Sequence, residues 1–270
     1  MFCRVILLGL FMVSLLGSAA MAGSVRINGS TTILPVVQAL AEAFMQDYPD
    51  VNVSVSGGGS GNGIKALLDG TVDIGDSSRF LKDEEVKAAL GRRVYLVPFA
   101  IAYDCIVPVV HLSNPLENIT LAQLKAIYSG KISNWKDFGG HDMSIVVISR
   151  DTASGTFEIW DEKVMKKERV FPKALLQSSN GAVVQTVSRN RHSIGYVGVG
   201  YVDKSVKPLA VEGIVGNRET VLDGRFPISR ALFMFTRGWP AGDTLRFINY
   251  TINPGIGQRF VRDAAFIPLY

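Results

Sequence analysis

Two periods of hydrophobic and polar positions alternate along the chain. Residues 24–29 ("SVRING") and 51–56 ("VNVSVS") alternate apolar and polar side chains, which is typical of half-buried strands. Between these segments, apolar residues recur three or four positions apart and predict an amphipathic helix. The apolar positions are Ile33, Val37, Leu40 and Phe44. The run Ser30–Thr32 precedes them, and we expect it to supply the N-cap oxygens of this helix.

The same order of strand, loop and helix continues through the chain. A glycine-rich loop at 57–63 leads into a predicted helix at 64–70, and strands are predicted at 71–75 and 144–149. A helix is predicted at 156–165, with Phe157, Trp160 and Val164 on one stripe. This alternation favours α/β layers around a largely parallel sheet. No linker stands out, so two lobes would be joined by short crossings.

The first 22 residues have the form of a secretory signal peptide. Arg4 is their only charge, an apolar run extends from Val5 to Leu16, and Ala20-Met21-Ala22 is a small-x-small cleavage pattern. The apolar run is shorter than the roughly 20 residues that a transmembrane helix needs. An uncleaved anchor is the alternative, without a stop-transfer pattern to support it. We therefore expect export to the periplasm, or to the cell surface if the envelope has no outer membrane.

The charge of the chain is small and mixed in sign. Lys and Arg number 28 against 24 Asp and Glu, which gives a formal net charge of +4. No block of like charge suggests a surface for nucleic acid or membrane. We expect no nucleic-acid partner, and we expect a monomer.

The cysteines and histidines give no sign of a metal or a cofactor. Cys105 is the only cysteine after residue 22, so we expect a small buried hydrophobic side chain rather than a disulfide. His111, His141 and His192 are scattered without the spacing of metal ligands. No metal site and no cofactor are predicted.

Three loops before predicted helices share glycines and hydroxyl side chains. They are "GSTT" at 29–32, "GGGSGNG" at 57–63 and "ASGT" at 153–156. The first backbone N–H groups of a helix lack internal partners, and the helix dipole favours negative charge there. Arg150 precedes the third loop, and a guanidinium can hold two oxyanion oxygens at once.

Each loop alone has an ordinary explanation. The first could be simple capping, the second a flexible turn, and Arg150 could pair with Asp151, Glu158 or Asp161. None of them matches a P-loop, a dinucleotide fingerprint or a nucleophile elbow. Ser154 has no evident histidine base, so hydrolysis of phosphate esters is disfavoured and we expect no enzyme activity. Together, the loops and the arginine indicate a site that binds an anion.

Seven longer motifs extend this pattern over nearly the whole chain after residue 22. They are, in order, "INGSTTILPVVQALAEAF", "GGGSGNGIKALLDGTVDIGDSSR", "IYSGKISNWKDFGG", "SRDTASGTFEIW", "SNGAVVQTV", "IGYVGVGYVD" and "PISRALFMFTRG". In this order the chain resembles the phosphate-binding proteins of bacterial phosphate ABC transporters in their shorter form, which are type II periplasmic binding proteins. The resemblance implies two α/β lobes of mixed, mostly parallel sheets flanked by helices, with a ligand cleft between them.

The resemblance also implies a function and lobe boundaries. The implied function is capture of inorganic phosphate and its delivery to a membrane-embedded ABC permease. Sulfate, molybdate or tungstate is the alternative ligand. The crossings would lie near 99–104 and just after 194–203, so that lobe 1 comprises 23–103 plus 204–270 and lobe 2 comprises 104–203.

The family's binding residues carry over onto ten positions. These are Thr31, Thr32, Ser60, Gly61, Ser78, Arg79, Arg150, Ser154, Gly155 and Thr156. Longer family members have an aspartate at the position of Ser78, where it accepts the proton of hydrogen phosphate. Asp104 is our first candidate to replace that acceptor and Asp76 the second. Asp104 could instead organise the hinge, and Asp76 could be a solvated loop residue.

Overall fold

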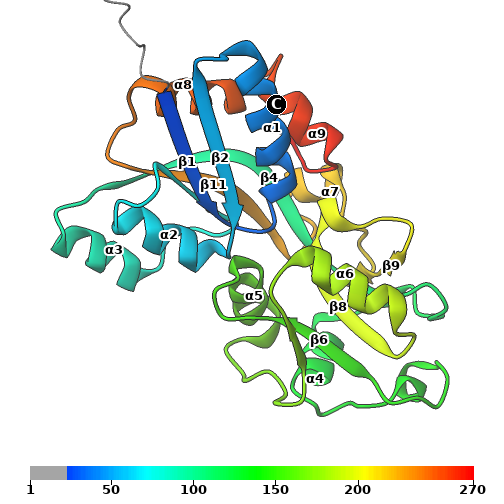
Figure 1. Cartoon of the computed structure of the whole chain (residues 1–270). Helices are drawn as coiled ribbons and strands as arrows, with labels where there is room; N and C mark the ends of the chain where they lie inside the picture. The colour runs from blue at the N-terminus through cyan, green and yellow to red at the C-terminus, as the bar shows by residue number, and fades with distance from the viewer. Residues whose placement is uncertain (1–22) are drawn as a thin grey trace, which may run out of the picture.

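The computed structural model describes residues 23–270, and the predicted signal peptide at 1–22 lies outside the described residues. One long sheet runs through the described chain (Figure 1). Its strands in spatial order are β2 (Val51–Gly57), β1 (Gly23–Gly29), β3 (Ile74–Ser77), β11 (Ser229–Arg237), β4 (Leu96–His111), β8 (Ser193–Gly198), β6 (Val146–Arg150) and β7 (Leu175–Gln177). A further strand, β9 (Val206–Pro208), pairs with β4, and β5 (Asn118–Ile119) pairs with β10 (Ala210–Val211).

The helices fall into two groups that cover the two ends of this sheet (Figure 1). The first group is α1 (Leu34–Asp47), α2 (Ser60–Leu68), α3 (Asp83–Gly91), α8 (Gly242–Ile252) and α9 (Gly257–Asp263). The second is α4 (Leu121–Tyr128), α5 (Gly155–Trp160), α6 (Asn180–Arg189) and α7 (Arg218–Leu222). Three single turns complete them: η1 (Trp135–Phe138), η2 (Asp161–Met165) and η3 (Val199–Tyr201).

Strand β4 connects two hydrophobic cores. Its residues 96–105 pair with β11, whereas residues 106–111 pair with β8 and β9. We call the part around the core of Val25, Ile27 and Leu40 lobe 1, and the part around the core of Trp160 and Tyr196 lobe 2. The sheet is mixed because β4 and β11 are antiparallel, while β1, β2 and β3 are parallel, as are β6, β7 and β8.

Most elements predicted from periodicity are present. The predicted strands at 24–29, 51–56 and 144–149 correspond to β1, β2 and β6, and the stripe of Phe44 and its partners faces the lobe 1 core in α1. The predicted helix at 156–165 is α5, which continues as one π-helical turn, η2. Cys105 is fully buried, as predicted.

Three local predictions were wrong. The N-cap of α1 is Ile33 and receives no side-chain cap, so the Ser30–Thr32 hydroxyls are available for other partners. Helix α2 begins at Ser60 inside the glycine-rich loop, which positive φ at Gly59 allows to turn directly into a helix. Strand β3 begins only at Ile74, because the turn that follows α2 occupies the preceding residues.

The chain between residues 206 and 228 packs with lobe 2. Leu209, Val211 and Phe226 lie in the same core as Trp160 and Tyr196. From the family resemblance, this stretch was expected to belong to lobe 1. We propose instead that the second crossing lies at the start of β11, because β11 is the strand that returns to pair with β3. The first crossing then lies within β4, beside Cys105.

Candidate anion-binding site

Arg150 occupies the end of β6 and is 1% exposed. Its Nε donates to the Gln177 carbonyl at 3.0 Å, and its Nη2 donates to the Ser178 carbonyl at 3.0 Å and to Thr31 Oγ1 at 3.2 Å. Among the described residues, Nη1 has no hydrogen-bond partner. Arg150 forms no ion pair with any described residue, so the alternative of a pair with a neighbouring carboxylate is wrong. A buried guanidinium without a carboxylate is costly unless an anion compensates its charge.

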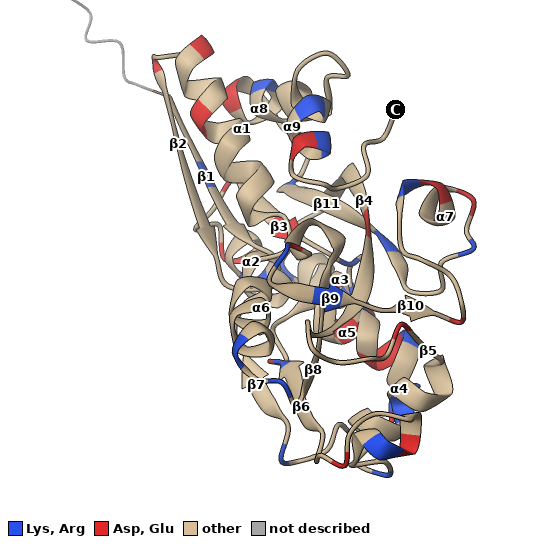
Figure 2. Ribbon diagram, turned by 90° about the vertical axis from the view of Figure 1, so that its right-hand side faces the viewer, with Lys and Arg blue, Asp and Glu red and all other residues tan. Residues whose placement is uncertain are grey.

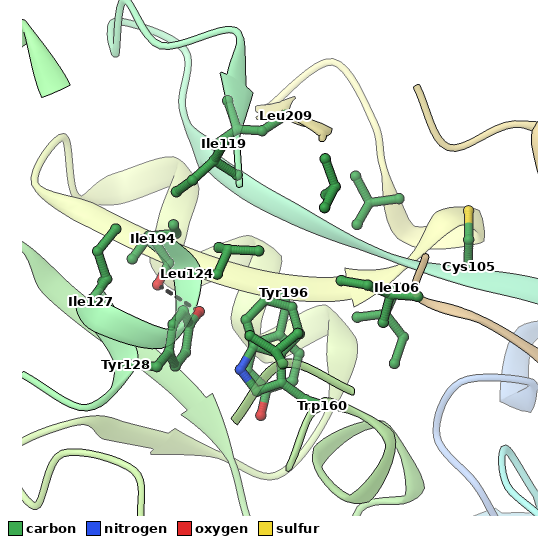
Figure 3. Packing of buried hydrophobic residues seen from close by; sticks show 14 of the residues in the cluster. Cys105, Ile106, Ile119, Leu124, Ile127, Tyr128, Trp160, Ile194, Tyr196 and Leu209 are labelled. Carbon is green, nitrogen blue, oxygen red and sulfur yellow. Dashed lines mark hydrogen bonds between the residues drawn. The ribbon is translucent and has the colours of Figure 1, made fainter. Parts of the chain in front are cut away.

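The aromatic core of lobe 2 fixes the backbone of Arg150. The Tyr196 hydroxyl accepts from the Arg150 N–H at 3.2 Å and is hydrogen-bonded to Ser149 Oγ at 3.0 Å. The Tyr196 ring stacks on Trp160, with ring centroids 4.1 Å apart and planes 6° apart (Figure 3). Burial lowers the pKa of Arg150 from its ordinary value because it disfavours the charged form.

Hydroxyl groups from the two lobes meet beside Arg150. Thr32 Oγ1, at the start of α1, lies 3.0 Å from Thr156 Oγ1 of α5. Thr31 is held from the other lobe as well, because the Tyr201 hydroxyl donates to its carbonyl. All three threonines are at most 8% exposed. The structure therefore brings together four predicted residues, Thr31, Thr32, Arg150 and Thr156.

Two further side chains of this group, Asn180 and Arg230, were not predicted from the sequence. Asn180 Nδ2 donates to Thr32 Oγ1 at 3.2 Å and lies 3.4 Å from Thr31 Oγ1. Arg230 donates from Nη1 to Thr156 Oγ1 at 3.1 Å and from Nη2 to Thr32 Oγ1 at 3.3 Å. A signal for Arg230 was present, since a charged residue begins the otherwise apolar strand segment "RALFMF".

Asp104 is fully buried and neutralises Arg230. Its Oδ2 accepts from Arg230 Nε at 2.8 Å and Nη2 at 2.6 Å, and its Oδ1 accepts from the Val199 N–H at 2.9 Å. Burial raises the pKa of Asp104, and the Arg230 guanidinium opposes that rise. Arg150 and Arg230 contribute two buried positive charges, and the Asp104 carboxylate offsets one of them. The threonine hydroxyls therefore lie beside a net positive charge.

Asp76 lies within β3 and is 2% exposed, so the alternative of a solvated loop residue is wrong. Its Oδ1 has no hydrogen-bond partner in the described part of the chain. Burial raises the pKa of Asp76 well above its ordinary value, because no cation close to it opposes the desolvation. Asp76 is therefore a buried acid that favours its protonated form more than Asp104 does.

A second contact between the lobes involves Ser60, Ser78 and Gly155. Ser60 Oγ lies 3.3 Å from Ser78 Oγ and accepts from the Ser78 N–H at 3.0 Å. A Cβ atom at Gly155 would collide with Ser60 Oγ and lie 2.8 Å from Ser78 Oγ. The Gly61 N–H donates across the same contact to the Ala153 carbonyl at 3.1 Å. The lobes are thus in direct contact, and glycine at 155 permits this closeness.

Two predicted site residues have other partners. Ser154 Oγ accepts from the Phe157 N–H at 3.2 Å, so its hydroxyl caps α5. Arg79 is 4% exposed and forms ion pairs with Glu85 and Glu158. Neither side chain has a hydrogen bond to the hydroxyls of Thr31, Thr32 or Thr156 among the described residues.

No group of three or more His, Cys, Asp or Glu side chains in residues 23–270 is arranged to hold a metal ion. In the view of Figure 2, ribbon segments of Lys and Arg and segments of Asp and Glu are interspersed over both lobes. Two buried arginines, Arg150 and Arg230, lie at the junction of the lobes, and only Arg230 has a carboxylate partner, Asp104.

Known proteins share this architecture. A family model described as "PBP superfamily domain" matches residues 17–254. The phosphate-binding protein PstS of Bacillus subtilis is 30% identical over 257 residues, which cover 94% of this chain and 83% of the relative. PstS of a Staphylococcus aureus strain is 31% identical over 81% of this chain and 70% of its own length.

Solved structures agree with these matches. A Clostridium perfringens structure, described as a phosphate ABC transporter substrate-binding protein with bound phosphate, has a TM-score of 0.86 and 36% identity, covering 92% of this chain and all of its own. An ABC-type phosphate transport receptor from Vibrio cholerae has a TM-score of 0.72 and 30% identity, over 90% and 99% of the chains. The fold is thus that of a two-lobe periplasmic binding protein of type II.

The chain belongs to the PBP superfamily and, within it, to the family of PstS phosphate-binding proteins. The resemblance stated from the sequence motifs is confirmed, and so is the predicted two-lobe α/β fold.

Proposed function

We propose that this protein captures inorganic phosphate between its two lobes and delivers it to the permease of an ABC transporter. The observation that carries the proposal is the position of Arg150, a buried guanidinium without a carboxylate, beside hydroxyls from both lobes. The relatives named PstS and the phosphate-bound neighbour support phosphate as the anion. Such a receptor holds the anion and releases it unchanged, so the protein is not an enzyme.

We propose specific roles for the residues at the junction of the lobes. Arg150 supplies the main charge, and Thr31, Thr32 and Thr156 exchange their mutual hydrogen bonds for bonds to phosphate oxygens. Asn180 and Arg230 orient these hydroxyls, because both already donate to Thr32 Oγ1. Ser60, Ser78, Gly61 and Gly155 line the adjacent contact between the lobes. Charge-assisted hydrogen bonds contribute about 1.5–3 kcal/mol each, so several must converge for tight binding.

A carboxylate that accepts the phosphate proton would make the site bind phosphate in preference to sulfate, since sulfate has no proton to donate at neutral pH. Asp104 stays our first candidate, because Arg230 joins it directly to Thr32 and Thr156. Asp76 is the second candidate, because it is buried with an unpartnered Oδ1. Ser78 offers no carboxylate, which keeps sulfate, molybdate and tungstate as alternative ligands.

The proposed function requires the protein to act outside the cytoplasm. We propose that the mature chain is exported, works outside the cytoplasm as a monomer, and meets its permease at the membrane. The signal-peptide pattern of residues 1–22 supports export. In residues 23–270 no helix combines the length and apolarity needed to cross a bilayer.

Calorimetry of the mature chain with phosphate, sulfate and molybdate tests the proposal. We expect phosphate to bind with one site per chain and sulfate to compete poorly. No heat and no thermal stabilisation with millimolar phosphate would refute the proposal. Tighter binding of another oxyanion would assign the site to that ligand instead.

A further inference from the structure

Arg79 lies between two carboxylates that belong to different lobes. Its Nη1 and Nη2 contact the two carboxylate oxygens of Glu85, each at 2.7 Å, within lobe 1. Its Nε forms an ion pair with Glu158, on α5 of lobe 2. Lys82 Nζ pairs with the other oxygen of Glu158 at 2.9 Å. Two cations of lobe 1 therefore hold one carboxylate of lobe 2.

These contacts leave Arg79 with little capacity for an anion. Nη1 also donates to the Phe80 carbonyl at 2.8 Å, so both terminal nitrogens have hydrogen-bond partners, while Nε has the ion pair with Glu158 and no hydrogen bond among the described residues. The side chains of Arg79 and Glu158 are 4% and 14% exposed. Ion pairs shielded from water to this degree are screened weakly by salt. The contact is therefore more than a pair of mobile surface charges.

Glu158 is connected to the binding site through α5. It lies two residues after Thr156, whose hydroxyl meets Thr32 of lobe 1. A cation that holds Glu158 thereby holds the start of α5 against lobe 1. One surface groove is lined by residues of both lobes, among them Arg79, Lys82, Glu158 and Glu162. The ion-pair network therefore lies at a surface that the two lobes form together. Because its members belong to both lobes, opening the lobes would separate them.

We propose that Arg79, Lys82 and Glu158 form a closure latch, a set of positioning residues that slows release of the bound anion without touching it. The inference rests on the proposed capture of phosphate between the lobes. Ligand contacts and latch contacts form together on closure, so each stabilises the other. The family resemblance assigns Arg79 to ligand binding. In this proposal, Arg79 instead affects ligand release through its ion pair with Glu158.

The latch and simple electrostatics predict opposite signs for one substitution. Glu158 carries a negative charge close to the anion site, so removing that charge should tighten phosphate binding if the carboxylate only repels the ligand. If Glu158 holds the lobes closed, the same removal should weaken binding. Glu158→Gln preserves the shape of the side chain and separates the two effects.

Calorimetry and stopped-flow kinetics of phosphate binding provide the test. We expect Glu158→Gln to raise the dissociation rate about tenfold, with an association rate within about twofold of the wild type, because breaking a buried pair acts mainly on dissociation. Glu219→Gln is the matched control, because it removes the same charge from an α7 side chain that is 81% exposed and pairs with Arg225. Unchanged or tighter binding by Glu158→Gln overturns the latch. Failure of the wild type to bind phosphate refutes the proposed function instead.

A double-mutant cycle separates the latch from a direct ligand role of Arg79. If Arg79 acts through Glu158, Arg79→Met should weaken phosphate binding in the wild type and have little further effect in Glu158→Gln. If the losses of phosphate affinity in the two single variants add fully in the double variant, Arg79 contacts the ligand independently of Glu158, and the latch is overturned. Lys82→Met serves as a second arm, because Lys82 is 38% exposed and its removal should not prevent folding. A dissociation rate of Lys82→Met equal to that of the wild type would also contradict the latch.

Discussion

Arg230 and Asp104 lie directly opposite each other in the antiparallel pairing of β11 and β4, and two guanidinium nitrogens contact one carboxylate oxygen at 2.8 and 2.6 Å. Asp104 is the last but one residue of β4 to pair with β11, before the strand passes into lobe 2. Arg230 also reaches Thr32 of lobe 1 and Thr156 of lobe 2. One buried ion pair therefore contacts both sides of the cleft at the point where they join.

The first prediction concerns Asp104→Asn. It leaves Arg230 buried without its carboxylate, and breaking a buried pair in this way costs about 3–5 kcal/mol. We expect urea unfolding to show a loss of that order in the absence of phosphate, with part of it restored by phosphate. If Asp104 accepts the phosphate proton, calorimetry should also show a reduced preference for phosphate over sulfate. An unaltered preference would leave Asp76 as the acceptor.

The second prediction concerns Arg150→Ala. The variant removes the guanidinium whose charge has no carboxylate partner, together with its bond to Thr31. We expect phosphate affinity to fall by about ten- to a hundredfold or more, since each charge-assisted bond contributes about 1.5–3 kcal/mol. Circular dichroism should show a folded protein. Arg191→Ala, at an exposed position, is the control for loss of one positive charge, and equal affinities of the two variants would remove Arg150 from the site.

The third prediction uses the glycine at the start of α5. Gly155→Ala adds a Cβ that collides with Ser60 Oγ and crowds Ser78 Oγ, so it opposes closure of the lobes. We expect at least a tenfold loss of phosphate affinity, and small-angle scattering should show a more extended protein in the presence of phosphate. Gly181→Ala is the matched control, because an added Cβ there meets its nearest atom only at 3.9 Å. Equal affinity of both variants would contradict a closed binding state.

The fourth prediction concerns pH and Asp76. Burial raises the pKa of this carboxyl in the folded chain, so the folded state binds its proton more tightly than the unfolded state does. The contribution of Asp76 to stability is fully present below about pH 3.9 and is lost as the pH rises through the folded pKa. Asp76→Asn should therefore gain stability relative to the wild type with rising pH, by at most about 1.4 kcal/mol per pH unit. Urea unfolding of both proteins from pH 5 to pH 8 measures this gap, and a constant gap would contradict the prediction.

Local sequence patterns predicted those residues of the candidate site that lie in loops directly before helices. Alternation and helical spacing located β1, α1, β2 and α5, and the short hydroxyl loops located Thr31, Thr32 and Thr156. The hydroxyl run before α1 was expected to cap the helix. The structure directs these side chains to Arg150 and Thr156 instead, because the helix begins two residues after Thr32.

The parts that sequence patterns missed depend on contacts between distant segments. Arg230 enters the site only because β11 pairs with β4 in a register that sets it opposite Asp104. Arg79 forms ion pairs with Glu85 and with Glu158, a residue on the other lobe. Phe226 likewise packs in the lobe 2 core with residues from many separate segments, so its position cannot be predicted from any one segment. Periodicity carries no information about such pairings.

Strand β11 lies between β3 and β4, which do not pair with each other, and it is made after all of lobe 2. During synthesis from the N-terminus, the sheet of lobe 1 therefore stays divided until residues 229–237 leave the ribosome. The strand that completes the sheet also brings Arg230 to Thr32 and Thr156. A truncated or stalled chain lacking this strand has neither a closed lobe 1 sheet nor the side chain of Arg230, so the sheet and the group of residues around Thr32 and Thr156 are completed in the same step.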